Sequence, residues 1–312
     1  MTFEDAARKV HLEQSRTFRN PKHRAQWIAS LEADVFPTIG KRRIDAIASS
    51  DVLSVLSPVW TAKPETARRL KQRMRVVFDW AKASGLRAGD NPTEGLVKVL
   101  PKHRATAKHH PAMPYERVSE FVSDVQNFDG SELLKLGFAF LILTAARTGE
   151  ILKATWKEVD LQRKVWTIPA DRMKAQREHR VPLSPRAVDI LERARTLGGS
   201  TASYVFPGRP DRPFSDMAFL MLLRRMGRAN VPPHGFRSSF RDWSAERTNA
   251  PHAVSEAALA HSQRDKVEAA YRRSDLFEKR RSLMDSWSSF VAGSVGKVVK
   301  MREVDPVFWT GA

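Results

Sequence analysis

The 312-residue chain contains no cysteine and only three tyrosines. Without cysteine it can form no disulfide, no zinc site with thiolate ligands and no thiol nucleophile. No run of residues approaches the roughly 20 apolar positions that a membrane-spanning helix needs. The N-terminal stretch MTFEDAARKVHLEQ also lacks the apolar core of a signal peptide, so the sequence predicts a cytoplasmic protein with no membrane contact.

Acidic residues are scarce relative to basic ones. The chain has 53 Lys and Arg against 35 Asp and Glu, a formal net charge of +18 and a pI near 10.5. Such an excess favours a polyanionic partner, because basic side chains along a phosphate backbone release condensed counterions. Nucleic acid is therefore the expected partner, and a basic protein without one is the alternative. Charge by itself does not distinguish binding DNA from cutting it.

Helical periodicity dominates the first hundred residues. It predicts helices over 3–17, 22–36 and 64–85, the last with Pro64 in its first turn and Gly85 at its stop. The apolar residues of the third helix fall on one stripe, namely Leu70, Met74, Val77, Phe78 and Ala81. The cations lie mostly off that stripe and are predicted to contact DNA, a merely solvated face being the alternative: Arg68, Arg69, Lys71, Arg73 and Arg75.

A basic stretch with three prolines divides the chain. KVLPKHRATAKHHPAMP (98–114) has no clear period and predicts an extended linker over 99–114, in which Lys102 and Arg104 are expected to contact DNA. The chain is thereby divided into a helical domain at 1–98, a larger domain at 115–293 and a tail at 294–312. Phe308 and Trp309 are costly to leave in water, so the tail is expected to pack on its own or a neighbouring larger domain.

The larger domain mixes helices with a little β-structure. Helices are predicted near 115–127 and within SELLKLGFAFLILTAARTGE, where Arg147 stands at the end of an apolar helix. The runs KVWTIP (164–169) and HRVPLS (179–184) predict a β-hairpin, and the later pattern is helical apart from YVFPG at 204–208. The fold class expected is mainly α with a small β-hairpin or sheet.

Six side chains of this domain together suit metal-free phosphoryl transfer. In chain order they are Arg147, Lys174, His234, Arg237, His261 and Tyr271. Two guanidiniums can grip phosphate oxygens in bidentate fashion and stabilise the charge of the transition state. A lysine can protonate the leaving sugar oxygen, a histidine can take the tyrosine proton, and the tyrosine can attack phosphorus. No metal is expected, because no carboxylate cluster has ligand spacing.

This ordered set resembles the tyrosine recombinases, or phage-type integrases, which share a catalytic domain with the type IB topoisomerases. The resemblance covers roughly residues 115–290, and "RTGE", "HGFR", "LAH" and "AYRRSD" are especially similar to integrases of prophages and genomic islands. It implies a two-domain DNA clamp, with 1–98 as the core-binding domain and 115–293 as the catalytic domain. Many such integrases carry a further N-terminal arm-binding domain, and its absence before TFEDAARKV is expected to reflect either the natural protein or a truncation.

The resemblance also assigns roles within the site. Lys174 is the expected hairpin lysine, with Lys164 as the alternative, and Glu150 is expected to orient the neighbouring side chains. His261 is expected mainly to donate a hydrogen bond to phosphate, since the family accepts tryptophan there. Tyr271 would attack the scissile phosphate, form a 3′-phosphotyrosyl link and release a 5′-hydroxyl without cofactor, metal or ATP.

The implied partners are double-stranded DNA attachment sites, on which four protomers would form a tetramer in the bacterial cytoplasm, associated with the nucleoid. Accessory DNA-bending or directionality proteins are candidate partners. Three functions remain open from the sequence: a mobile-element integrase, a type IB topoisomerase or dimer-resolving recombinase with the same chemistry, and a non-catalytic site-specific DNA-binding protein.

Overall fold

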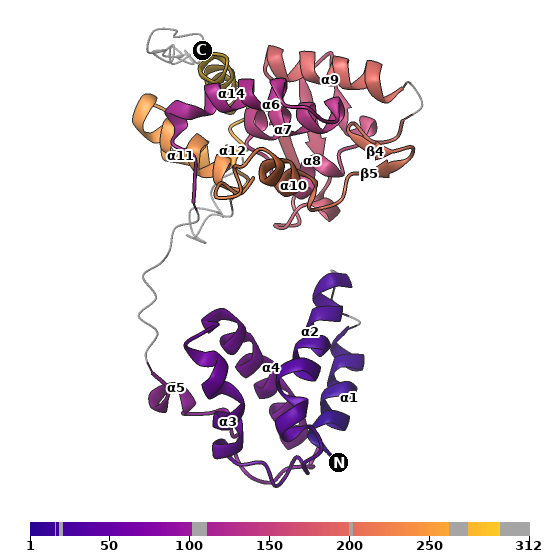
Figure 1. Ribbon diagram of the computed structural model, residues 1–312, viewed down its shortest axis with the longest axis vertical. Coiled ribbons are helices and arrows are strands. Elements are labelled where there is room, and N and C mark those ends of the chain that lie inside the picture. Colours follow the sequence, from indigo (N-terminus) through magenta and orange to yellow (C-terminus); the bar gives the residue numbers. More distant parts are fainter. Residues whose placement is uncertain (16, 19–20, 102–110, 200–201, 262–273, 294–312) are drawn as a thin grey trace, which may run out of the picture. The chain divides into compact units, whose positions relative to one another are not determined.

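The computed structural model divides the chain into two compact units, Met1–Lys108 and His109–Ala312, whose elements are labelled in Figure 1. It describes all residues except 16, 19–20, 102–110, 200–201, 262–273 and 294–312. Each unit has its own cluster of buried apolar side chains. Predictions for Lys102, Arg104, Tyr271 and the tail therefore lie outside the described residues, and the linker stays a prediction.

The first unit is helical. It consists of α1 (Phe3–Ser15), α2 (Pro21–Asp34), a π-helical turn η1 (Phe36–Gly40), α3 (Ser49–Trp60), α4 (Pro64–Ala83) and α5 (Leu96–Val99). The three predicted helices are confirmed to within two residues at each end. Helix α3 was not predicted, because its β-branched residues and internal Pro58 are poor helix formers. Burial of its apolar face against α4 stabilises it instead.

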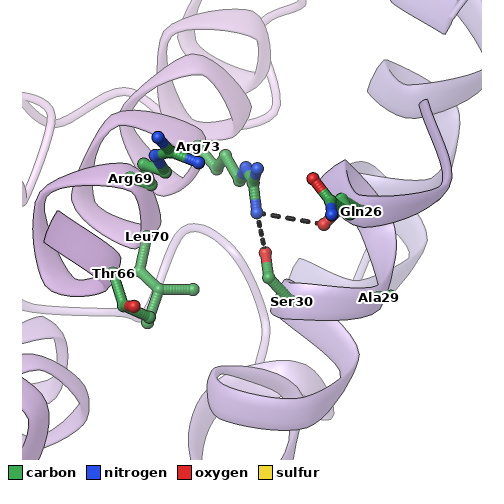
Figure 2. A pocket seen from close by; sticks show the side chains of 7 residues that line it. All are labelled: Gln26, Ala29, Ser30, Thr66, Arg69, Leu70 and Arg73. Carbon is green, nitrogen blue, oxygen red and sulfur yellow. Dashed lines mark hydrogen bonds between the residues drawn. The ribbon is translucent and has the colours of Figure 1, made fainter. Parts of the chain in front are cut away.

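Helix α4 confirms the predicted apolar stripe but corrects one of its cations. Leu70 and Val77 are fully buried, and Arg73, between them on the same face, is only 9% exposed. Arg73 Nη1 donates to the Gln26 carbonyl at 3.0 Å and to Ser30 Oγ, both on α2 (Figure 2). The prediction that Arg73 faces DNA phosphates is wrong in this respect: its guanidinium joins two helices inside the unit.

The remaining α4 cations are more exposed, but three of them have acidic neighbours. Arg69 Nε lies 3.0 Å from Glu65, which Arg68 also approaches at 4.0 Å, and Arg75 Nε lies 3.5 Å from Asp79. Ion pairs at this spacing on an exposed helix face are worth only about 0.3–0.5 kcal/mol, so they leave the cations free to exchange partners.

The second unit is built around α7 (Glu132–Thr144), in which every residue from Leu134 to Thr144 is buried. Around it lie η2 (Tyr115–Arg117) with α6 (Val118–Asn127), α9 (Pro185–Gly198), α10 (Ala218–Arg225) and α14 (Phe277–Val291). Such all-round burial explains why α7 is apolar on every face. Of the helices that the structure describes, none is long and apolar enough to cross a membrane.

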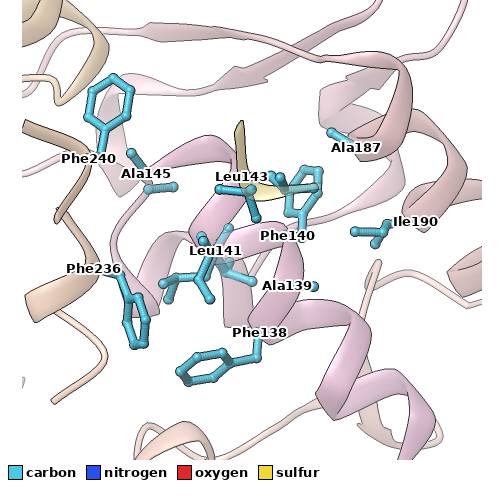
Figure 3. Packing of buried hydrophobic residues seen from close by; sticks show 14 of the residues in the cluster. Phe138, Ala139, Phe140, Leu141, Leu143, Ala145, Ala187, Ile190, Phe236 and Phe240 are labelled. Atoms are coloured by element: carbon cyan, nitrogen blue, oxygen red, sulfur yellow. The ribbon is translucent and has the colours of Figure 1, made fainter. Parts of the chain in front are cut away.

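Aromatic contacts connect α7 to α11 (Gly235–Arg247) and to the sheet. Phe138 packs edge-on against Phe236 at 5.6 Å between ring centroids, and Phe140 lies 5.5 Å from Trp166. Figure 3 shows the cluster, with Phe236 and Phe240 of α11 beside α7. The apolar core thus fixes both the first turn of α11 and the strands relative to α7.

The predicted hairpin is confirmed and gains a third strand. Strands β1 (Val159–Asp160), β2 (Val165–Ile168) and β3 (His179–Pro182) form an antiparallel sheet in that order, with Val165 opposite Pro182. A second sheet pairs β4 (Pro207–Arg209) with β5 (Arg212–Pro213). Strand β1 is only two residues long, too short for an alternating pattern to appear in the sequence. The mainly α fold class with small sheets is confirmed.

The segment after α7 differs from the expected single helix. Helix α7 ends at Thr144, Ala145 takes a left-handed conformation at φ +49°, and α8 (Thr148–Leu152) follows. Arg147 consequently precedes a second helix rather than ending the first. This break leaves the carbonyl of Ala145 outside a helical hydrogen-bond ladder, where a side chain can reach it.

Candidate active site

Arg237 is the most buried of the predicted site residues that the structure describes, with 4% of its surface exposed. It stands in the first turn of α11, where its Nη1 donates to the Ala145 carbonyl and its Nη2 to the Leu259 carbonyl. Burial, with the nearby charge of Arg147 second, lowers the pKa of Arg237 to about 10. The guanidinium therefore stays charged near neutral pH.

A glycine permits this close packing at the start of α11. A Cβ on Gly235 would lie 2.5 Å from the carbonyl oxygen of Pro111, closer than a real Cβ contact allows. The "HG" pair thus brings the helix start against the segment at 111–112, and Arg237 follows two residues later. The sequence alone does not reveal this contact.

Arg147 approaches the same region from the loop between α7 and α8. Its Nη1 lies 2.7 Å from Glu150 Oε1, and its Nη2 donates to the Ala260 carbonyl at 3.1 Å. The other carboxylate oxygen of Glu150 accepts from the Arg147 backbone N–H at 2.8 Å, so one side chain holds both ends of the arginine. The predicted orienting position of Glu150 agrees with these contacts; its role stays a prediction.

Backbone carbonyls just after α12 (His252–Ala258) bring the two arginines together. Arg237 binds the Leu259 carbonyl and Arg147 the Ala260 carbonyl, at a turn where Ala260 has φ +48°. These acceptors carry the partial negative charge of a helix end, which offsets the cost of placing two cations side by side. Sequence reasoning did not identify them, because a carbonyl belongs to every residue type.

His261 follows this turn and completes the cluster. Its Nε2 lies 3.2 Å from Arg237 Nη2, and its Nδ1 lies 2.9 Å from Glu256 Oε2. The ring is 37% exposed and so reaches solvent. Burial, reinforced by the charges of Arg237 and Arg147, lowers the pKa of His261, although Glu256 opposes the shift. Glu256 was not predicted as a site residue. Its position five residues before His261 is the sequence feature that could have indicated it.

Of the other predicted residues of this unit that the structure describes, His234 and Lys174 are exposed. His234 is the exposed N-cap of α11, three residues before Arg237. Lys174 is exposed in the turn between β2 and β3, whereas Lys164, at φ +54°, directly precedes β2. No hydrogen bond or ion pair joins Lys174 to the two arginines within the part of the chain that the structure describes.

His179 is a further residue that the sequence did not single out. It begins β3, opposite Ile168, and a hydrogen bond with the backbone of Ala258 ties it to the end of α12. Burial, followed by the charges of Arg280, Arg147 and Arg237, lowers its pKa to about 3. His179 is therefore neutral near pH 7 and adds no positive charge to the site.

Taken together, the described residues form a cationic site. Arg147, Arg237 and His261 converge on one turn, and this set can bind an anion with charge-assisted hydrogen bonds. Among the described residues, no group of three His, Cys, Asp or Glu side chains could hold a metal ion.

Comparisons with known proteins agree with this fold. Residues 3–95 match the phage integrase central domain, and residues 113–276, more than half of the chain, match the phage integrase family. The chain belongs to the phage integrase family. That match spans all six of the residues singled out in the sequence.

Individual relatives extend along most of the chain. Prophage integrase IntA of Escherichia coli (strain K12) is 34% identical over 86% of this chain and 65% of its own length. The integrase of Enterobacteria phage P4 is 29% identical over 96% of this chain and 71% of its own. The chain thus spans just under two thirds of the length of IntA.

Solved structures show the same fold at low identity. A lambda integrase fragment (75–356), solved as a dimer bound to a COC′ core site, has a TM-score of 0.68 and 13% identity, covering 84% of this chain and 96% of that one. The Tn1549 transposon integrase, in complex with circular intermediate DNA, has a TM-score of 0.63 and 16% identity, covering 91% and 99%.

Proposed function

We propose that the protein is a site-specific DNA recombinase, an integrase of a mobile element, which cuts and rejoins DNA through a 3′-phosphotyrosyl intermediate. The observation that carries the proposal is the convergence of Arg147 and Arg237 on the turn at Leu259 and Ala260, beside His261, in a phage integrase family member. Two guanidiniums held by backbone acceptors form a preorganised binding site for one phosphodiester.

In the proposed reaction, Tyr271 Oη attacks the scissile phosphorus while the bond to the 5′ oxygen breaks. His234 takes the tyrosine proton, and Lys174 gives a proton to the departing 5′ oxygen. Arg147 and Arg237 stabilise the charge that accumulates on the non-bridging oxygens. A 5′-hydroxyl of another strand reverses the steps and completes the exchange.

The first unit would hold the DNA through its exposed cations. On α4 these are Arg68, Arg69 and Arg75, with the half-buried Lys71 beside them; Lys102 and Arg104 are proposed to add contacts from the linker. Their ion pairs with Glu65 and Asp79 are exposed and weak, so phosphates can replace the carboxylates. Such contacts fix position on the duplex without reading its sequence.

The proposed partners are double-stranded attachment sites and three further copies of the chain. One lambda integrase structure is a tetramer bound to a Holliday junction, with a TM-score of 0.67, which supports this assembly for a protein of the same fold. Accessory DNA-bending or directionality proteins are proposed from the resemblance alone. The proposed location is the bacterial cytoplasm, where the nucleoid supplies the DNA.

A covalent-trapping experiment tests the function. The protein is incubated with sheared genomic DNA of its source and denatured, and the fragments that stay attached are sequenced, with Tyr271→Phe in parallel. Attachment at discrete sites that disappears in the variant is expected. Attachment that survives the substitution would assign the nucleophile elsewhere. Relaxation of any supercoiled plasmid, regardless of sequence, would favour a type IB topoisomerase, and no attachment at all would favour a non-catalytic DNA-binding protein.

A further inference from the structure

His261 lies between a carboxylate and a guanidinium, and the two contacts are different in kind. Glu256 Oε2 is 2.9 Å from Nδ1 on one side of the ring. Arg237 Nη2 is 3.2 Å from Nε2 on the other side. Arginine can only donate hydrogen bonds, and an ionised carboxylate can only accept them. The two neighbours therefore determine which ring nitrogen of His261 donates a hydrogen bond and which one accepts.

These hydrogen bonds select one tautomer. Because Arg237 donates to Nε2, this nitrogen carries a lone pair and no proton. The proton of the neutral ring is then on Nδ1, from which it is donated to Glu256. The alternative tautomer would place two N–H groups opposite each other at Nε2 and a bare nitrogen against a carboxylate at Nδ1. The structure thus disfavours it twice.

Glu256 is itself held in place. Its Oε1 lies 3.1 Å from Arg241 Nε and 3.7 Å from His252 Nε2, ion-pair distances without a hydrogen bond. Burial raises the pKa of Glu256, but the hydrogen bond from His261 and the surrounding cations outweigh it and keep the pKa below its usual value. Glu256 is consequently an anion near neutral pH and stays a hydrogen-bond acceptor.

We propose that Glu256 is a positioning residue for His261. By holding Nδ1–H, it leaves Nε2 to bind the scissile phosphate, and Nε2 can donate that hydrogen bond only when the ring is protonated. The inference rests on the function proposed above. With Nδ1–H fixed on Glu256, Nε2 can donate to a phosphate oxygen only after gaining a proton of its own. Phosphate binding is coupled to the uptake of one proton from the buffered solvent onto Nε2, and the phosphate and Glu256 then stabilise the imidazolium from opposite sides. Arg237 Nη2 is released from Nε2 to the phosphate in the same step.

The groups facing this pair set the expected pH dependence. Arg237 and Arg147 disfavour the imidazolium of His261, whereas Glu256 favours it, and Arg241 and His252 act on Glu256 from behind. Removal of the carboxylate leaves the two arginines unopposed, so the pKa of His261 falls. The alkaline limb of the cleavage profile, where the imidazolium loses its proton, should then move to lower pH.

Glu256→Gln tests this directly. The amide has the same shape but is uncharged and can donate or accept, so only Arg237 still disfavours the alternative tautomer. The single-turnover rate of covalent complex formation should fall on the order of tenfold to hundredfold near pH 7.5, and less at pH 6. Glu278→Gln, an exposed substitution on α14, serves as the matched control and should keep the wild-type profile. An unchanged pH profile in Glu256→Gln overturns the proposal.

A double-mutant cycle separates positioning from general support of the fold. In a His261→Ala background, Glu256→Gln should cause no further loss of cleavage, because it acts through the ring. Equal losses in both backgrounds would mean a structural role and overturn the proposal. Thermal melting of each variant identifies any that are unfolded.

The tautomer can also be measured without activity. In protein labelled with ¹⁵N at histidine, the His261 ring should show a protonated Nδ1 and a bare Nε2 above its pKa. The share of the other tautomer should rise in Glu256→Gln, where only Arg237 disfavours it. A wild-type ring protonated at Nε2 overturns the proposal even if cleavage is normal. A protein that shows the expected tautomer but never attaches to DNA would instead count against the proposed function.

Discussion

The two units of this protein hold their arginines in opposite ways. On α4 of the first unit, Arg68, Arg69 and Arg75 are 55–61% exposed, and each pairs with a carboxylate on its own helix. In the second unit, Arg147 is 25% and Arg237 4% exposed, and backbone carbonyls from distant segments bind both. Exposed cations attract a polyanion over a distance, whereas held cations fix one phosphate.

Burial alone does not separate the two kinds. Arg73 in the first unit and Arg280 in the second are also buried, at 9% and 1% exposed, and each connects two secondary-structure elements. Arg280 Nη1 donates to the Arg180 carbonyl and Nη2 to Asp275, between α14 and β3. Arg280 also has a second cation nearby, Arg180, but both bind Asp275. Arg237 differs because it lies within hydrogen-bond distance of His261 and shares with Arg147 the backbone carbonyls of one turn.

The largest effect is expected at the held cations. Arg237→Lys keeps the charge but cannot reach the Ala145 and Leu259 carbonyls together while also donating to phosphate. Covalent complex formation should fall on the order of a thousandfold, as for loss of an oxyanion donor. Single-turnover trapping measures it, with DNA binding as the control. Near wild-type cleavage by Arg237→Lys would show that the planar guanidinium, with its several N–H donors, is not required.

A smaller effect, on stability rather than chemistry, is expected at Arg73. Arg73→Met removes the hydrogen bonds to the part-buried Gln26 carbonyl and to Ser30, each worth about 0.5–1.5 kcal/mol. Denaturant unfolding should show this loss, whereas the exposed Arg69→Met should change stability by less than about 0.5 kcal/mol. Equal stability of the two variants would contradict the structural role assigned to Arg73.

The smallest effect per residue is expected on α4. Replacing Arg68, Arg69 and Arg75 together by Gln should weaken DNA binding and reduce its salt dependence by about one unit of slope for each phosphate that is no longer neutralised. The cleavage rate at saturating DNA should not change. Binding titrations at several salt concentrations provide the measurement, with Arg193→Gln on α9 as the control. An unchanged salt dependence of binding would mean that these three arginines face solvent and do not contact DNA phosphates.

Much of the fold followed from periodicity. The stripe from Leu70 to Ala81 predicted α4 because helical spacing is local, and two short β-branched runs predicted the hairpin for the same reason. Arg73 was misplaced because position 73 lies at the edge of the stripe, and its burial depends on α2 lying opposite. Helix α3 was missed because tertiary packing, rather than propensity, stabilises it.

The sequence by itself determined the chemistry available to this protein: the order Arg147, Lys174, His234, Arg237, His261 and Tyr271, the excess of positive charge and the mainly helical class. Only the tertiary structure decided how part of that set is held. Arg237 binds a carbonyl 92 residues earlier in the chain, and Glu256 fixes one side of His261. The sequence gives the identity of each side chain directly. A backbone carbonyl is free to bind a distant arginine only where a helix ends and another segment packs against it.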